Sequence, residues 1–179
     1  MTTLPVDEII LAAQKPSRYV GCELGAVHKD PASVRLRFAL AFPDTYEVGM
    51  SNLGFRLLYH ALNDRPDVAC ERLFLPWPDL QQSLRQAAIP LFTLESRAPA
   101  RTFDIIGITL QFELCYTSVL ALLDLAGIPI LARERGPRAP LVLGAVTHVK
   151  ARALDAGRWS AINDAVFEPL PLSYVNEVL

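Results

Sequence analysis

The residues best suited to bind a ligand follow the first long apolar stretch of the sequence. Asp44, Tyr46 and Gly49 lie in a short polar connection between an expected strand at 34–42 and an expected helix at 48–63. In an open α/β sheet, the loops that follow the carboxyl ends of the strands form the ligand crevice. This connection is therefore the first candidate site.

Two further groups of polar residues are expected at the same edge of the sheet. Met50, Ser51 and Asn52 stand at the start of the helix, where free backbone N–H groups and the helix dipole suit a phosphate or a carboxylate. A second polar loop at 111–116 follows another buried strand. The candidate binding residues there and on the last strand are Gln111, Glu113, Tyr116, Thr117 and Gly144.

The same residues also have purely structural interpretations. Asp44, which follows a strand and a proline, is an ordinary turn residue. Tyr46 can cover the strand edge with its hydroxyl in water, and Gly49 can allow close packing at the helix start. Ser51 or Asn52 can cap the helix, and the polar residues of the second loop can cap the next one. Both interpretations stay open at the level of the sequence.

Alternating strand and helix patterns predict the α/β class, with an open, mostly parallel sheet and helices on both faces. The run 35–42 begins as alternation and becomes continuously apolar, which is typical of a strand buried on both faces. The expected strands are 34–42, 70–75, 90–94, 104–110, 128–131 and 140–144, and the expected helices are 6–13, 48–63, one beginning at Asp79, and 117–126, with a further helix over 146–161.

Apolar spacing and capping residues define the expected helix faces. Asp79 and Gln82 match a weak capping box, Thr117 or Ser118 is the expected cap of the next helix, and Gly127 fits its C-terminal left-handed position. The buried face of the helix at 48–63 is expected to comprise Met50, Leu53, Gly54, Leu57, Leu58, Ala61 and Leu62, and that of the following helix Leu80, Leu84, Ala87 and Ala88.

Composition bounds the class of protein. The chain has 179 residues, 51% of them apolar, and a net charge of −2, which indicates one domain and no nucleic-acid surface. No apolar run reaches the roughly 20 residues of a membrane helix, and the N-terminus lacks a signal-peptide pattern, so a cytoplasmic protein is expected. Cys22, Cys70 and Cys115 lack CxxC or CxxxCxxC spacing, so neither an iron–sulfur cluster nor another metal site is predicted.

Several motifs follow one another along residues 15–144. They are Lys15-Pro-Ser-Arg-Tyr19, the segment 41–54, Glu71-Arg-Leu-Phe-Leu-Pro-Trp-Pro-Asp79, Pro90-Leu-Phe-Thr-Leu-Glu-Ser96, Phe103-Asp-Ile-Ile-Gly107, the segment 110–117, and Leu122-Leu-Asp-Leu-Ala-Gly-Ile-Pro129. Together these collinear motifs resemble the N-terminal region of certain radical S-adenosylmethionine (SAM) proteins. The resemblance implies a cobalamin-binding-like Rossmann domain that precedes a radical barrel carrying the CxxxCxxC cluster motif.

The chain departs from the family pattern in two places. Gly144-Ala145-Val146 stands where a glycine pair and a proline are expected, and the later family segment is only faintly matched. We therefore expect an N-terminal leader at 1–33 packed on the domain, a cobalamin-binding-like domain at 34–144, and a divergent C-terminal tail at 145–179. A truncated, non-functional fragment is one interpretation of this pattern.

The resemblance also suggests a cofactor. Cobalamin domains commonly carry Asp-x-His-x-x-Gly after the first strand, and the matching residues here are Asp44, Tyr46 and Gly49. A neutral phenol is a poor cobalt ligand. If cobalamin binds, we expect its lower axial position to be empty or held by water.

Three functions remain open from the sequence. The first is a cofactor-holding module, for cobalamin or a similar group, that serves a radical SAM barrel. The second is a cofactor-free domain that docks on such a barrel or self-associates, with Pro76-Trp-Pro78 and the leader as contact surfaces. The third is an independent enzyme with Asp44, Glu47 and Glu113 as acid–base candidates. Catalysis by the chain alone is the least supported, and the oligomeric state is not indicated.

Overall fold

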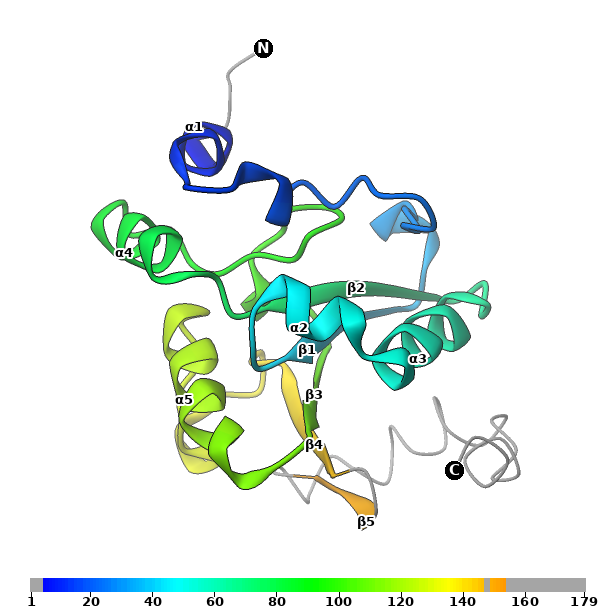
Figure 1. The fold of residues 1–179 in the computed structure, drawn as a ribbon. Helices are drawn as coiled ribbons and strands as arrows, with labels where there is room; N and C mark the ends of the chain where they lie inside the picture. Colours follow the sequence, from blue (N-terminus) through cyan, green and yellow to red (C-terminus); the bar gives the residue numbers. More distant parts are fainter. Residues whose placement is uncertain (1–4, 147–148, 154–179) are drawn as a thin grey trace.

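The computed structural model describes residues 5–146 and 149–153 and contains one five-stranded sheet (Figure 1). The strand order is β2-β1-β3-β4-β5, and the first four strands are parallel, while β5 pairs antiparallel with β4. The predicted α/β class with a mostly parallel sheet is confirmed. The strands are β1 (Leu36–Phe42), β2 (Val68–Phe74), β3 (Ile105–Leu110), β4 (Leu141–Val146) and β5 (Val149–Ala153).

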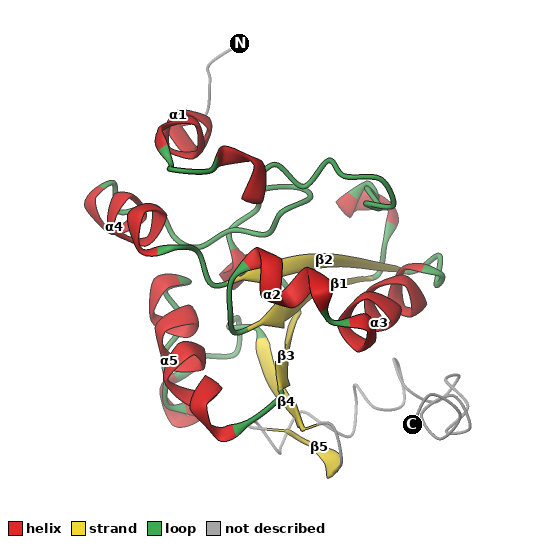
Figure 2. Ribbon diagram, in the orientation of Figure 1, coloured by secondary structure: helices red, strands yellow, loops and turns green. Residues whose placement is uncertain are grey.

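Helices cover both faces of the sheet, as expected (Figure 2). Phe38, Leu40 and Phe42 of β1 pack on one face with α3, whereas Ala39 and Ala41 pack on the other with α4 and α5. Both sets are buried, which explains the continuous apolar run in the sequence. The helices are α1 (Pro5–Ala12), α2 (Tyr46–Ser51), α3 (Leu53–Asn63), α4 (Pro78–Gln86) and α5 (Tyr116–Leu125).

The single helix expected at 48–63 is wrong, because the chain forms two helices that meet at Asn52. The backbone of Asn52 is extended, with φ −80° and ψ 114°, and its Oδ1 accepts a hydrogen bond of 2.9 Å from the backbone N–H of Phe55. Asn52 therefore ends α2 and caps the start of α3.

This break also changes the buried face of the helix. Phe55, Tyr59 and Leu62 of α3 are buried, whereas Leu53 and Leu57, which we expected to face the core, are exposed. Gly54 is exposed as well. Because the helical rotation restarts after Asn52, the apolar spacing read across the break does not describe one face.

The next two helices differ from expectation mainly at their caps. The expected Asp79–Gln82 capping box is wrong, because α4 is preceded by Trp77 and Asp79 instead accepts a hydrogen bond of 2.8 Å from the backbone N–H of Gln14. Ala87 and Ala88 are exposed because α4 already ends at Gln86.

The expected caps of α5 are also wrong at its start. Cys115, rather than Thr117 or Ser118, precedes the helix. The expectation for Gly127 is confirmed, since its φ of +68° lies in the left-handed region that favours glycine.

Two expected strands and one expected helix are wrong. Residues 90–94 lie outside the sheet, and Leu94 N donates to the carbonyl of Arg72 on the outer edge of β2 (2.9 Å). Residues 128–131 follow α5 without forming a strand. In the region expected as a helix at 146–161, residues 149–153 form β5, which pairs with β4 beyond the expected domain boundary at 144. Val146 ends β4, and residues 147–148 and 154–161 of that region lie outside the described residues.

The leader crosses the outer edge of β2. The side chain of Ile10 in α1 is buried in the core beside α4, and Arg97 of the loop at 90–99 is paired with Asp7. Gly21 has a φ of +60°, and a side chain there would overlap the carbonyl of Leu94. Every helix in the described part of the chain is too short or too polar to cross a bilayer.

Gly107 gives a test of the packing between β3 and β1. An added Cβ would lie 2.5 Å from Cζ of Phe38, so Gly107→Ala should lower the free energy of unfolding by about 1–3 kcal/mol. Urea unfolding measures this change, and adding Phe38→Leu should recover part of it. Gly136→Ala is the matched control because open space surrounds Gly136. Equal stability of Gly107→Ala and wild type would contradict this packing.

Candidate functional site

The carboxyl ends of β1 and β3 lie side by side at one edge of the sheet. The two strands pair in parallel, with Ala41 opposite Ile108. From β1 the chain moves outward to β2, and it then returns past β1 to β3. The connections after β1 and β3 therefore leave the same edge in opposite directions, which is the switch point where ligands of such folds bind. The two polar loops begin at one edge, as expected from the sequence.

The first loop turns toward β2 and away from β3. The carbonyl of Asp44 accepts a hydrogen bond of 3.0 Å from Leu75 N, just beyond β2. The ring of Tyr46 packs edge-on against Phe74 of β2, with centroids 5.5 Å apart, and its hydroxyl donates to Glu23 (3.3 Å). Burial and the Glu23 carboxylate raise the pKa of Tyr46, so its phenol stays protonated.

Asp44 and Gly49 have local structural roles. Oδ1 of Asp44 accepts a hydrogen bond of 2.6 Å from Thr45 N, as in a turn. Gly49 is buried, and a Cβ there would overlap the ring of Phe74 and lie 3.1 Å from Phe42. Gly49 is required because the helix start packs closely on the ends of two strands.

The helix-start residues point in different directions. The hydroxyl of Ser51 donates to the carbonyl of Val48 (2.7 Å), and Asn52 caps α3 as described above. Sδ of Met50 lies 3.5 Å from Nη1 of Arg72, on the β2 side of the molecule. The structure therefore does not bring Met50, Ser51 and Asn52 into one polar patch.

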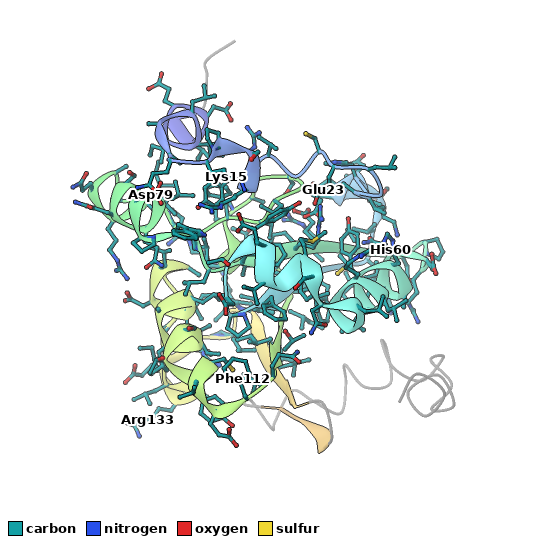
Figure 3. The ribbon with its side chains drawn as sticks, in the orientation of Figure 1. Lys15, Glu23, His60, Asp79, Phe112 and Arg133 are labelled. Atoms are coloured by element: carbon teal, nitrogen blue, oxygen red, sulfur yellow. The ribbon has the colours of Figure 1, made fainter. Side chains whose placement is uncertain are left out.

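The second loop is the more exposed of the two. It contains the short 3₁₀ helix η4 (Glu113–Cys115), and its large apolar side chains Phe112, Leu114 and Tyr116 are 54%, 82% and 51% exposed. In Figure 3, Phe112 lies on the opposite side of α2 from Lys15 and Glu23.

The polar residues predicted to bind a ligand on this loop are half-buried or exposed. Gln111 is half-buried, Glu113 is exposed, and the exposed Thr117 donates to the carbonyl of Leu114 at 3.5 Å. Gly144 lies in β4 opposite Ile108, and a Cβ there would lie 3.0 Å from Leu110. Within residues 5–146, no hydrogen bond or ion pair joins this loop to the loop at 43–52.

The three acid–base candidates do not form a catalytic group with one another. Glu47 accepts from Arg18 (2.6 Å) and from Lys15 (3.2 Å). Although burial acts in the opposite direction, these cations lower the pKa of Glu47 to about 2, which makes it a weak base near neutral pH. Asp44 is engaged in its turn and Glu113 lies on the second loop.

A cluster of buried charges around Arg72 was not expected from the sequence. The side chains of Arg72 in β2 and of Glu95 are only 3% and 2% exposed, and they form an ion pair of 2.6 Å. Arg72 also pairs with Glu23 of the leader, and its guanidinium lies 4.9 Å from the ring centre of Tyr59. Burial opposes the charge of Arg72, but Glu95 and Glu23 raise its pKa above the ordinary value.

Glu71, the residue before Arg72 in β2, binds the loop at 90–99 through Thr93 and Ser96. One of its oxygens accepts from Thr93 Oγ1 (2.6 Å) and from the N–H and hydroxyl of Ser96 (3.1 and 2.6 Å). Its other oxygen lies 3.8 Å from Arg37. The only signal in the sequence was a pair of adjacent charges, Glu71 and Arg72, inside an otherwise apolar strand.

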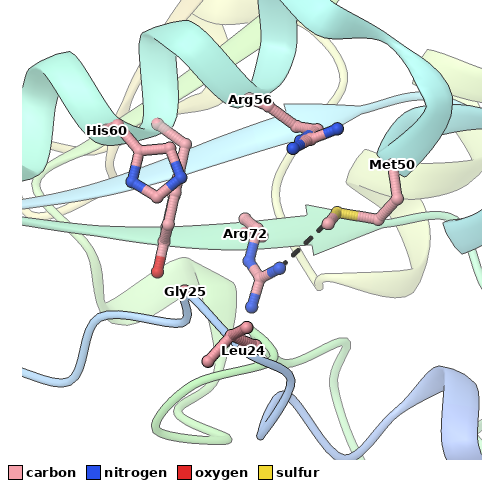
Figure 4. A pocket seen from close by; sticks show the side chains of 7 residues that line it. Leu24, Gly25, Met50, Arg56, His60 and Arg72 are labelled. Atoms are coloured by element: carbon pink, nitrogen blue, oxygen red, sulfur yellow. Dashed lines mark hydrogen bonds between the residues drawn. The ribbon is translucent and has the colours of Figure 1, made fainter.

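A small pocket opens beside Arg72 (Figure 4). It has a volume of about 120 Å³ and lies between the leader, α2, α3 and β2. Met50 is the predicted site residue that lines it, together with Leu24, Gly25, Arg56, Tyr59, His60 and Arg72.

Metal-binding groups do not gather in the described part of the chain. Three or more His, Cys, Asp or Glu side chains nowhere come together there in a way that could hold a metal ion. Cys70 and Cys115 are buried and Cys22 is exposed, and burial raises the pKa of the Cys70 thiol.

Comparison with protein families identifies the relatives of this chain. The model of a family described as "Radical SAM proteins, N-terminal" matches residues 54–155, which is more than half of the chain. The chain belongs to this family. It is therefore an N-terminal module of a radical SAM protein. Searches of curated proteins and of solved structures found no match.

The radical SAM N-terminal domain should lose part of its stability in acid through Glu47. Its pKa is about 2 in the folded protein and near 4.5 otherwise, so its contribution is present above pH 4.5 and lost as the pH falls through 2. Glu47→Gln should reduce the free energy of unfolding at pH 7 by about 1 kcal/mol or less, because the pair is partly exposed. Denaturant unfolding from pH 7 to pH 2 should show this difference vanish. Glu113→Gln is the control, and a difference that grows in acid would contradict the assignment.

The ion pair in the interior of the domain gives a larger effect. Arg72→Met should lower the free energy of unfolding by about 3–5 kcal/mol, because Glu95 then remains buried without its partner. Adding Glu95→Gln should recover part of this loss in urea unfolding, because the amide removes the unpaired charge and its oxygen can still accept from the backbone N–H of residue 72. A double variant that is less stable than Arg72→Met alone would contradict the pairing.

Proposed function

We propose that this radical SAM N-terminal domain docks on the catalytic domain of a radical SAM protein and does not perform chemistry itself. The docking surface consists of Phe112, Leu114, Tyr116 and Leu120, at the start of α5. The observation that carries the proposal is the exposure of three large apolar side chains within the five residues 112–116. Large apolar side chains exposed close together on a folded domain commonly mark a site of interaction.

The location of this surface also supports docking. It lies at the carboxyl edge of the sheet, where the chain reverses its direction of winding. Burying each large apolar side chain at an interface contributes roughly 1.5–3 kcal/mol before the costs of association.

A catalytic domain is the partner that the family membership favours. The family is defined as the N-terminal part of radical SAM proteins. The proposal assigns the chemistry of a radical SAM protein to the part outside this N-terminal module.

Cofactor binding at the same edge has less support. In the cobalamin pattern, the residue at the position of Tyr46 has to face the cofactor. Tyr46 instead packs on Phe74 and bonds to Glu23, and the ring of Phe74 fills the space beside Gly49. We therefore favour docking over the holding of cobalamin as the role of this edge.

Binding to a catalytic domain tests the proposal directly. Mixed with a radical SAM catalytic domain of its own family, the chain should form a 1:1 complex. Leu114→Glu should weaken that complex at least tenfold in isothermal titration calorimetry, because it places a charge in the apolar contact. Leu11→Glu is the matched control, since Leu11 is 74% exposed on α1. In Figure 1, α1 lies on the opposite side of the molecule from the start of α5.

Three results would contradict docking through this surface. The first is the absence of a complex with wild-type protein. The second is equal binding by Leu114→Glu and wild type. The third is stoichiometric uptake of hydroxocobalamin, seen in the visible spectrum, that Leu114→Glu abolishes.

A further inference from the structure

The pocket beside Arg72 is separate from the docking surface and presents mainly hydrogen-bond donors. Arg56 and His60 enter it from one side of α3, four residues apart, and Arg72 enters from β2 (Figure 4). Leu24 and Gly25 of the leader line the opposite side, and Met50 borders it from α2. Arginine carries donors and no acceptor, so two arginines in one pocket select for a ligand with acceptor atoms.

Arg72 retains donors that nothing in the described structure uses. Its Nε donates to Glu95 (2.6 Å), and its Nη1 faces Glu23 and Met50. Its Nη2 is buried and has no hydrogen-bond partner among the described residues. The side chain is only 3% exposed, and buried charged donors without a partner are rare in native proteins. An unpartnered donor on a residue that lines a pocket points to a ligand with a complementary acceptor.

One cation of the pocket has no ion-pair partner among the described residues. Glu95 and Glu23 are already engaged with the other two nitrogens of Arg72. Arg56 forms no ion pair or side-chain hydrogen bond within residues 5–146, and the imidazole of His60 packs edge-on against the ring of Tyr59. The N–H groups of the Arg56 guanidinium therefore remain available to a ligand in the pocket.

We propose that this pocket binds the phosphate group of a small molecule. Nη2 of Arg72 and the guanidinium of Arg56 would donate to the phosphate oxygens, and His60 would supply a further donor. Arginine suits this role because its planar fork of N–H groups matches the geometry of an oxyanion. A volume of about 120 Å³ admits a phosphate group, while the body of a larger phosphoester lies outside. The proposal does not depend on docking, because the two surfaces share no residue.

Titration of the full chain with inorganic phosphate tests this site. At constant ionic strength, calorimetry should show saturable binding with one phosphate per chain. Arg56→Gln should weaken the affinity at least tenfold and His60→Asn should weaken it as well. Both side chains are exposed, so folding should be retained, and circular dichroism checks this. Arg101→Gln is the matched control, because this exposed arginine lines a different pocket between α4 and α5, and its affinity should change less than twofold.

A second arm uses adenosine monophosphate to separate the two sources of a phosphate group. Tighter binding than inorganic phosphate assigns the site to a phosphoester, and weaker binding assigns it to the free ion. The proposal is overturned if phosphate binding does not saturate, if Arg56→Gln binds like wild type, or if Arg101→Gln loses as much affinity as Arg56→Gln.

Discussion

The ion pair between Arg72 and Glu95 is the contact on which the arrangement of the other segments depends. β2 is an edge strand, and its open backbone groups would otherwise face water or another chain. Glu95 accepts from both the backbone N–H and the side chain of Arg72, and Leu94 N donates to the Arg72 carbonyl. The loop at 90–99 thereby covers this edge. Glu23 of the leader also forms an ion pair with Arg72. Two segments distant in sequence, the leader and the loop at 90–99, are therefore held on one strand.

This anchoring explains why the two polar loops differ. The hydroxyl of Tyr46 joins the charge cluster through Glu23, and Glu47 is paired with Lys15 and Arg18 of the leader. The loop after β1 is therefore drawn toward β2. The loop after β3 has no such anchor among the described residues, and its apolar side chains stay exposed. A polar loop that was the first candidate for binding thus has a structural role, and its neighbour becomes the candidate for contact with a partner.

The sequence predicted the parts of the fold that depend on local patterns. The run at 34–42 was expected as a strand buried on both faces, and 104–110 was expected as a further strand; β1 and β3 occupy these segments. The sequence offered Asn52 as a possible helix cap, and its bond to Phe55 N confirms this. The separate short helix α2 before Asn52 was not predicted, because the apolar spacing continues across the break. The segment 90–94 has the composition of a strand, but it covers the outside of the sheet through Leu94 and Glu95 and does not join it.

The candidate site was harder to predict, because its residues come from four separate segments. The common edge of the two loops followed from parallel topology alone. The pocket beside Arg72 depends on Gly25, Met50 and Arg56 reaching one side of β2, and no spacing in the sequence encodes that meeting. The adjacent charges of Glu71 and Arg72 in a buried strand were the one visible sign, since buried charges require partners.

Hydrogen–deuterium exchange of the chain, alone and with a radical SAM catalytic domain of its family, tests the central claim that this module contacts its partner through the start of α5. The account predicts that amide exchange slows at residues 111–120 in the complex and stays unchanged at 44–52 and 23–25. New protection at 44–52, with exchange at 111–120 as fast as in the free chain, would contradict it.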